Sequence, residues 1–163
     1  LHSFPTRRSS DLAEPIVITT FNRDENTKSG TIKNIRFFNV TAKGENGVLI
    51  HGNEDNIIED VTFENCSIEL TKTSKWQCGL YDLRPCLDYG VESYDNSAFF
   101  IRYAKDVNIR KTKTRWGNLC DSYSYAIDAA NVENLNLYEF DGKSAKENTD
   151  DIKIDRVKLN YKR

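Results

Sequence analysis

The sequence predicts an all-β fold, and three observations support this prediction. Asn, Thr, Ile and Val recur along the 163 residues, whereas Met is absent and Pro occurs only three times, a composition that favours strands and turns over helices. Apolar residues alternate in short runs rather than following a helical stripe. One pattern of core positions also returns several times along the chain, which is typical of a stacked repeat. Together these features predict a parallel β-solenoid of about five coils.

The repeat consists of apolar positions separated by steps of three, two and three residues. It is found in IKNIRFFNVTA from Ile32, IEDVTFENCSI from Ile58, AKDVNIRKTKT from Ala104, VENLNLYEFDG from Val132 and TDDIKIDRVKL from Thr149. The central step of two is the alternation of a strand with one buried face. Phe63 is therefore expected to point inward and its neighbour Glu64 outward. The steps of three predict bends at which the inward phase resets.

The distances between repeats suit one coil each. The second position holds Ile35, Val61, Val107, Leu135 and Ile152, so the spacings are 26, 46, 28 and 17 residues. Spacings of 26 and 28 fit one coil, and the spacing of 46 fits a coil with an insertion of roughly twenty residues. Stacked coils bury a shared core, in which each inward Ile, Val or Phe contributes ~1.5–3 kcal/mol.

A second set of strands lies between the first. It reads PIVITTF, NGVLIHG, SAFFIRY and YSYAIDA, aligned on Ile18, Ile50, Ile101 and Ile127. Asn39 and Asn65 also align, which predicts a stacked amide ladder that Lys111 interrupts. An antiparallel β-sandwich is the alternative architecture. It explains the alternation but not the fixed register between repeats.

The repeats resemble those of polygalacturonase-like glycoside hydrolases of family 28. The resemblance is carried by TIKNIRFFNVTAKGENGVLIHG, NIIEDVTFENCSIEL, GLYDLRP, SAFFIRYAKDVNI and YSYAIDAANVENLNL with the following DGKSA. It implies a right-handed, single-stranded parallel β-helix over residues 13–163. It also implies hydrolysis of glycosidic bonds in pectin-like polysaccharide with inversion, by an extracellular or periplasmic protein.

The catalytic signature of that family is not complete in this chain, so no catalytic residue is identified. GHG and RIK do not occur, and HGN at 51–53 is not GHG. The overlapping NTD at 148–150 and DD at 150–151 lie at the last strand segment and not in consecutive coils. An inverting glycosidase needs two carboxyl groups ~6.5–9.5 Å apart. The resemblance implies that these carboxylates belong to coils N-terminal to Ala13, and that the chain given is a C-terminal fragment without activity of its own.

The first twelve residues, LHSFPTRRSSDL, are expected to be foreign to the fold. They have no apolar periodicity and no apolar core of a secretory signal. Residues 2–12 back-translate to a nucleotide sequence that resembles a common short-read sequencing adapter. We therefore expect the native chain to begin near Ala13, and a disordered native tail is the alternative.

The segment at about 70–96 interrupts the repeat and provides the first candidate binding residues. Tyr81 offers a ring that can stack on a sugar, and Asp82 and Arg84 can bind hydroxyls or a uronate carboxylate, Arg84 through its bidentate fork. The alternative is a folded-back loop whose aromatic rings cover the flank of the solenoid.

The second strand set predicts a further polar column. If Ile50, Ile101 and Ile127 point inward, then the residues after them point outward, and these are His51, Arg102 and Asp128, with Thr19 below them. Adjacent coils are ~4.8 Å apart, so these side chains would be in contact. One interpretation is a polar wall for an anionic sugar, and the other is a cross-strand ion pair between Arg102 and Asp128.

The four cysteines show no paired metal-ligand spacing, and we expect neither a metal nor another cofactor. Cys78 and Cys86 flank GLYDLRP, so a disulfide could close that loop. Cys66 occupies a core position and is expected to be a small buried hydrophobe. No partner for Cys120 is evident.

Polysaccharide is the expected partner. The formal net charge is −2 with both signs interspersed, which argues against a nucleic-acid interface. No apolar run is long enough to span a membrane. Two alternatives to a hydrolase remain, namely a non-catalytic carbohydrate-binding or adhesive β-helix and a polysaccharide lyase of the same fold. The lyase is disfavoured because no cluster of acidic residues suggests a Ca²⁺ site.

Overall fold

The computed structural model describes residues 14–162, and these residues form strands and no helix. Their twelve strands are β1 (Ile16–Thr19), β2 (Lys33–Phe38), β3 (Thr41–Gly44), β4 (Val48–His51), β5 (Ile58–Glu64), β6 (Ser67–Leu70), β7 (Leu80–Asp82), β8 (Val91–Ser93), β9 (Phe99–Arg110), β10 (Lys113–Trp116), β11 (Ile127–Tyr138) and β12 (Ile152–Lys162). The expected all-β class is confirmed for this part of the chain. The predicted adapter-like tail, residues 1–12, lies outside the described residues.

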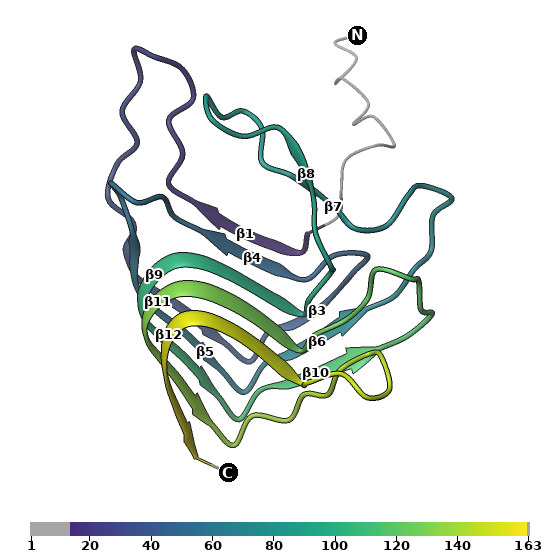
Figure 1. Cartoon of the computed structure of the whole chain (residues 1–163). Coiled ribbons are helices and arrows are strands. Elements are labelled where there is room, and N and C mark those ends of the chain that lie inside the picture. Colours follow the sequence, from purple (N-terminus) through teal and green to yellow (C-terminus); the bar gives the residue numbers. More distant parts are fainter. Residues whose placement is uncertain (1–13, 163) are drawn as a thin grey trace, which may run out of the picture.

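Parallel pairing dominates the sheets. The largest sheet has the order β1-β4-β9-β11-β12, and β2 and β5 join it through the second half of β9. A second parallel sheet has the order β10-β6-β3. Figure 1 shows β9, β11 and β12 as long bent strands stacked one beside the next. The first half of β9 continues the row of β1 and β4, and its second half continues the row of β2 and β5.

The bends predicted by the three-residue steps are present. A residue with positive φ precedes the second core position in four repeats, and another precedes the fourth core position in the same repeats. The first group is Asn34, Asp60, Asp106 and Asn134, and the second is Asn39, Asn65, Lys111 and Glu139. Asn and Asp adopt this left-handed conformation more readily than other non-glycine residues. The repeated sequence therefore specifies the bends between strand segments as well as the core positions.

The core lies between the two parallel sheets and contains the predicted inward residues. Phe63 is fully buried, stacks on Phe37 with ring centroids 4.6 Å apart and meets Phe99 edge-on at 5.2 Å. Glu64, the next residue along β5, is partly exposed. Cys66 is buried, as expected. The predicted contact between Asn39 and Asn65 is also present, since Asn65 Nδ2 donates to Asn39 Oδ1 at 2.7 Å.

The predicted alignment of the last repeat was wrong. Leu135 pairs with Leu159 rather than with Ile152, which instead pairs with Ile127. The cause is a register shift: β12 has one residue fewer than β11 between the pairs Val132–Val157 and Leu135–Leu159. Without that residue, β12 lacks the three-residue step of the repeat. A similar pattern occurs by chance seven residues earlier, so that Ile152 takes the position that belongs to Leu159.

The alignment of YSYAIDA with the other second-set strands was wrong by two residues. Ile18, Ile50 and Ile101 pair in register, but the next member of that column is Ala129 and not Ile127. The other members of this column are Ile residues, and the small Ala129 does not stand out in the sequence as an equivalent core position. The even shift preserves which residues share a face.

The insertion (residues 71–96) folds back over the stack instead of forming an open loop. Its strands β7 and β8 pair antiparallel, and Figure 1 shows them above β1 and β4. Tyr81 and Leu83 form a small apolar cluster with Leu49 of β4 and Phe100 of β9.

A disulfide holds the insertion at its start. Cys78 is bonded to Cys120, which lies in the connection between β10 and β11, with Cα atoms 6.7 Å apart. The pairing of Cys78 with Cys86 considered from the sequence is therefore wrong, and Cys86 is a free thiol. Nearness in sequence suggested Cys86, whereas the stacking brings the β10–β11 connection to the base of the insertion.

No helix in the described part of the chain is long and apolar enough to cross a membrane.

Candidate functional site

The sequence-predicted residues of the insertion do not form an open sugar platform. Tyr81 is fully buried, its ring lies 4.8 Å from that of Phe100, and its hydroxyl oxygen accepts a hydrogen bond from the Ser97 amide at 3.2 Å. Burial raises the pKa of the Tyr81 hydroxyl above its ordinary value. Tyr81 therefore acts as a covering residue, which agrees with the second of the two interpretations of this segment.

Asp82 and Arg84 bind each other at the surface of the insertion. Arg84 donates from Nε to Asp82 Oδ1 at 2.8 Å and from Nη2 to Oδ2 at 2.6 Å. These hydrogen bonds lower the pKa of Asp82. The guanidinium fork thus already holds a carboxylate, and a uronate would have to displace Asp82 to occupy it.

The predicted polar column is present but buried beneath the insertion. Thr19, His51 and Arg102 are paired in register across β1, β4 and β9. His51 is only 3% exposed, and the rings of Phe21 and Tyr89 lie 4.9 and 5.2 Å from its ring. A covered column of this kind cannot serve as an outer wall for a polymer.

The environment of His51 keeps its imidazole neutral. Burial lowers the pKa of His51 to about 4. Its Nδ1 lies 2.6 Å from the carbonyl oxygen of Gly52. A carbonyl only accepts, so Nδ1 carries the proton.

Asp128 joins this cluster diagonally, because it pairs with Phe100 and not with Arg102. Its Oδ1 lies 2.8 Å from Arg102 Nη2, and its Oδ2 lies 3.4 Å from Lys153 Nζ. Arg102 Nη1 also donates to the Asp128 carbonyl at 3.0 Å. Asp128 is 3% exposed. The ion-pair interpretation therefore describes the contacts of Arg102 and Asp128.

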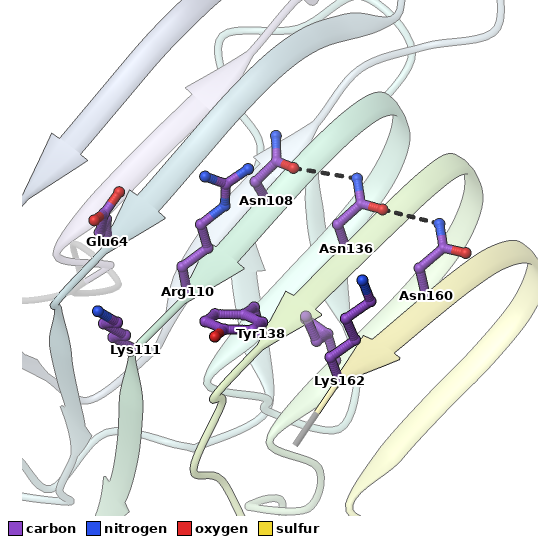
Figure 2. Close-up of a pocket in the computed structure, with 9 residues that line it drawn as sticks. Glu64, Asn108, Arg110, Lys111, Asn136, Tyr138, Asn160 and Lys162 are labelled. Atoms are coloured by element: carbon purple, nitrogen blue, oxygen red, sulfur yellow. Dashed lines mark hydrogen bonds between the residues drawn. The ribbon is translucent and has the colours of Figure 1, made fainter.

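A different face of the stack carries an open groove, which Figure 2 shows. It has a volume of about 750 Å³ and lies over the C-terminal ends of β5, β9, β11 and β12. Two adjacent rows of outward side chains line it. The first row is Asn108, Asn136 and Asn160, and the second is Glu64, Arg110, Tyr138 and Lys162, with Lys111 beside it.

The asparagine row is a hydrogen-bonded amide ladder. Asn136 Nδ2 donates to Asn108 Oδ1 at 3.1 Å, and Asn160 Nδ2 donates to Asn136 Oδ1 at 2.8 Å. At the other end, Asn108 Nδ2 donates to the Asp106 carbonyl at 3.2 Å. Each amide is thereby held in one orientation, so the ladder offers a rigid row of polar groups to the groove (Figure 2).

The second row is cationic and aromatic. Arg110, Tyr138 and Lys162 occupy the same position on β9, β11 and β12. Tyr138 is 43% exposed. Within residues 14–162, no carboxylate forms an ion pair with Arg110, Lys111 or Lys162. Three positive charges thus stand beside the single carboxylate of Glu64.

Sequence reasoning missed the groove, although a signal for it was present. Asn108 and Asn136 stand between the second and third core positions of their repeats, in VNI and LNL. The signal is weak because Arg36 and Thr62 hold the same position in the first two repeats. Asn160 was missed for a different reason, since the last repeat was aligned at the wrong place.

Comparison of the chain with protein-family models, with curated proteins and with solved structures gave no match. Within the described residues, no group of three or more His, Cys, Asp or Glu side chains is arranged to hold a metal ion.

Proposed function

We propose that this chain is part of a right-handed parallel β-helix protein that acts on pectin-like polysaccharide. The described coils contribute polysaccharide binding, and the acid and base of a polygalacturonase-like hydrolase belong to other coils of that protein. The observation that carries the proposal is the in-register parallel stack, in which equivalent side chains recur on successive strands.

A stack of this kind suits a linear polymer. Neighbouring strands are ~4.8 Å apart, so an outward row repeats its polar groups at a short and regular distance. A polysaccharide repeats its hydroxyl and carboxylate groups along one direction as well. Rows such as Asn108, Asn136 and Asn160 therefore offer several equivalent contacts to one chain. Contacts that are weak one at a time add up along the polymer.

The surroundings of the carboxylates favour binding over hydrolysis. An inverting hydrolase needs one carboxyl group as acid and another as base, ~6.5–9.5 Å apart with room for water. Asp128 is buried between Arg102 and Lys153, and Asp82 is held by Arg84. Among the described residues that line the open groove, Glu64 is the only carboxylate.

The disulfide between Cys78 and Cys120 supports an extracellular or periplasmic location, because disulfides persist in oxidising compartments. The alternative function is a non-catalytic carbohydrate-binding or adhesive β-helix. The three cations in the groove that lack an ion-pair partner within residues 14–162 favour this alternative equally, so the two differ only in whether other coils carry the acid and base.

The test uses the purified chain and two assays. Isothermal titration should show binding to polygalacturonate and no binding to neutral dextran. Reducing-end assays on polygalacturonate and rhamnogalacturonan should show no turnover. Turnover that is abolished by Asp128→Asn or His51→Ala would place the catalytic groups in this chain and contradict the proposal. Absence of binding to every acidic polysaccharide would contradict it as well.

A further inference from the structure

We propose that the groove over β5, β9, β11 and β12 is a binding site for uronate-bearing polysaccharide, separate from the face that the insertion covers. The inference rests on the proposed function and deepens it, because it locates the site and names the chemistry of its ligand. Figure 1 shows that the second halves of β9, β11 and β12 run along a different side of the stack from β7 and β8.

The charges of the groove select an anion. Elsewhere on the surface, Arg36 is paired with Asp60 and Arg115 with Asp141. Arg110, Lys111 and Lys162 line one groove together, and no carboxylate within residues 14–162 forms an ion pair with them. Hydrogen bonds to ionised groups are roughly twice as strong as those between neutral groups. A ligand that carries repeated carboxylates can engage these cations together.

The amide ladder supplies the neutral part of the recognition. Asn136 and Asn160 each donate one N–H to the preceding Asn of the row, whereas Asn108 Nδ2 donates to the Asp106 carbonyl and to Thr62 Oγ1. An amide has two N–H donors and an oxygen with two lone pairs. The remaining capacity faces the groove in an order fixed by the ladder. Sugar hydroxyl groups both donate and accept, so they match such a row. A small anion would leave it unused.

The exposed ring of Tyr138 adds a third type of contact. It stands between Arg110 and Lys162 along the row, as Figure 2 shows. A half-exposed aromatic ring can pack against the apolar face of a sugar while its hydroxyl stays in water. Cations, oriented amides and an aromatic ring within one groove together define a site for an acidic sugar chain.

A variant that lacks two of the groove cations tests whether the groove is the binding site. In the full chain, the variant Arg110→Gln/Lys162→Gln removes two groove cations. The control Lys113→Gln/Arg115→Gln removes the same number of charges from β10, on the other parallel sheet. We expect the groove variant to weaken binding of polygalacturonate at least tenfold in isothermal titration, and the control to stay within about threefold of the unmodified chain. Circular dichroism spectra check that both variants fold.

Two further arms define the ligand and the aromatic contact. Fully methyl-esterified polygalacturonate keeps the hydroxyl groups but loses the charges, so it should bind at least tenfold more weakly than the free acid. Tyr138→Ala should weaken binding more than Tyr138→Phe, which keeps the ring.

The outcomes separate this inference from the proposed function. If the chain binds polygalacturonate and the groove variant binds equally well, then the groove assignment is wrong while the proposed function stands. Equal binding of the esterified polymer would overturn the charge-based recognition. Tighter binding of duplex DNA or heparin than of polygalacturonate would also overturn the inference, since it would show a general polyanion surface. If no acidic polysaccharide binds at all, the proposed function itself fails.

Discussion

Buried His51 and partly buried Glu14 give the protein opposite responses to pH. His51 is neutral because burial lowers its pKa to about 4. Burial raises the pKa of Glu14 to about 7, and its Oε1 accepts a hydrogen bond from Asn46 Nδ2 at 2.8 Å. Asn46 also donates to the Leu80 carbonyl of the insertion at 2.9 Å. The two groups therefore flank the insertion from different positions on the stack.

The sign of each response follows from proton uptake. Between pH 4 and 6.5 the unfolded chain protonates His51 more than the folded chain does, so the stability from neutral His51 is lost as the pH falls through this range. For Glu14 the folded chain holds the proton more tightly between pH 4.5 and 7, so that stability is lost as the pH rises. In the unmodified chain the two effects oppose each other.

Single variants should reveal each effect. We expect the free energy of unfolding of Glu14→Gln to rise more steeply with pH between 4.5 and 6.5 than that of the unmodified chain. For His51→Asn we expect it to rise less steeply, or to fall. Urea denaturation at a series of pH values measures both profiles. If the free energy of unfolding changes with pH in the same way for both variants, then the pKa shifts of Glu14 and His51 do not affect stability as described.

At the scale of elements, the insertion depends on the bond between Cys78 and Cys120. The disulfide closes a loop with a sequence separation of 42 residues, for which the chain-entropy relation gives a stabilisation of about 4 kcal/mol. We expect Cys78→Ser/Cys120→Ser to lower the free energy of unfolding by an amount of this order. Proteolysis of the variant should begin within the insertion, because β7 and β8 form only a two-stranded sheet.

Thiol labelling supplies the control for this prediction. Alkylation of the native, unreduced protein should modify Cys86, whereas Cys66 should react only after unfolding, since it is buried in the core. Labelling of Cys78 or Cys120 under native conditions would contradict the assigned pairing. Mass spectrometry of the digested protein distinguishes the four cysteines.

The sequence was informative where core residues and bends recur in a fixed order. The repeats from Ile32, Ile58, Ala104 and Val132 are stacked as expected. The last repeat was misaligned because β12 lacks one residue of the pattern. The disulfide and the burial of Tyr81 depend on where the insertion folds back. A periodic pattern carries no information about a segment that interrupts it.

At the scale of the whole molecule, the parallel stack has two polar faces, of which one is covered and the other is accessible. On one face His51, Arg102 and Asp128 are covered: His51 contacts the ring of Tyr89 in the insertion, and Arg102 and Asp128 form an ion pair with each other. On the other face the amide ladder and its cations remain accessible. Sequence reasoning identified the first set of residues and assigned them a binding role as one alternative. The structure leaves the second set in a position to meet a polymer.

A crystal structure of the full chain soaked with a defined oligogalacturonide would show where the sugar binds. We expect sugar density across β9, β11 and β12 along the asparagine row, with carboxylates at Arg110 and Lys162 and one ring packed on Tyr138. Density under or beside the insertion, with an empty groove, would show that the groove is not the binding site.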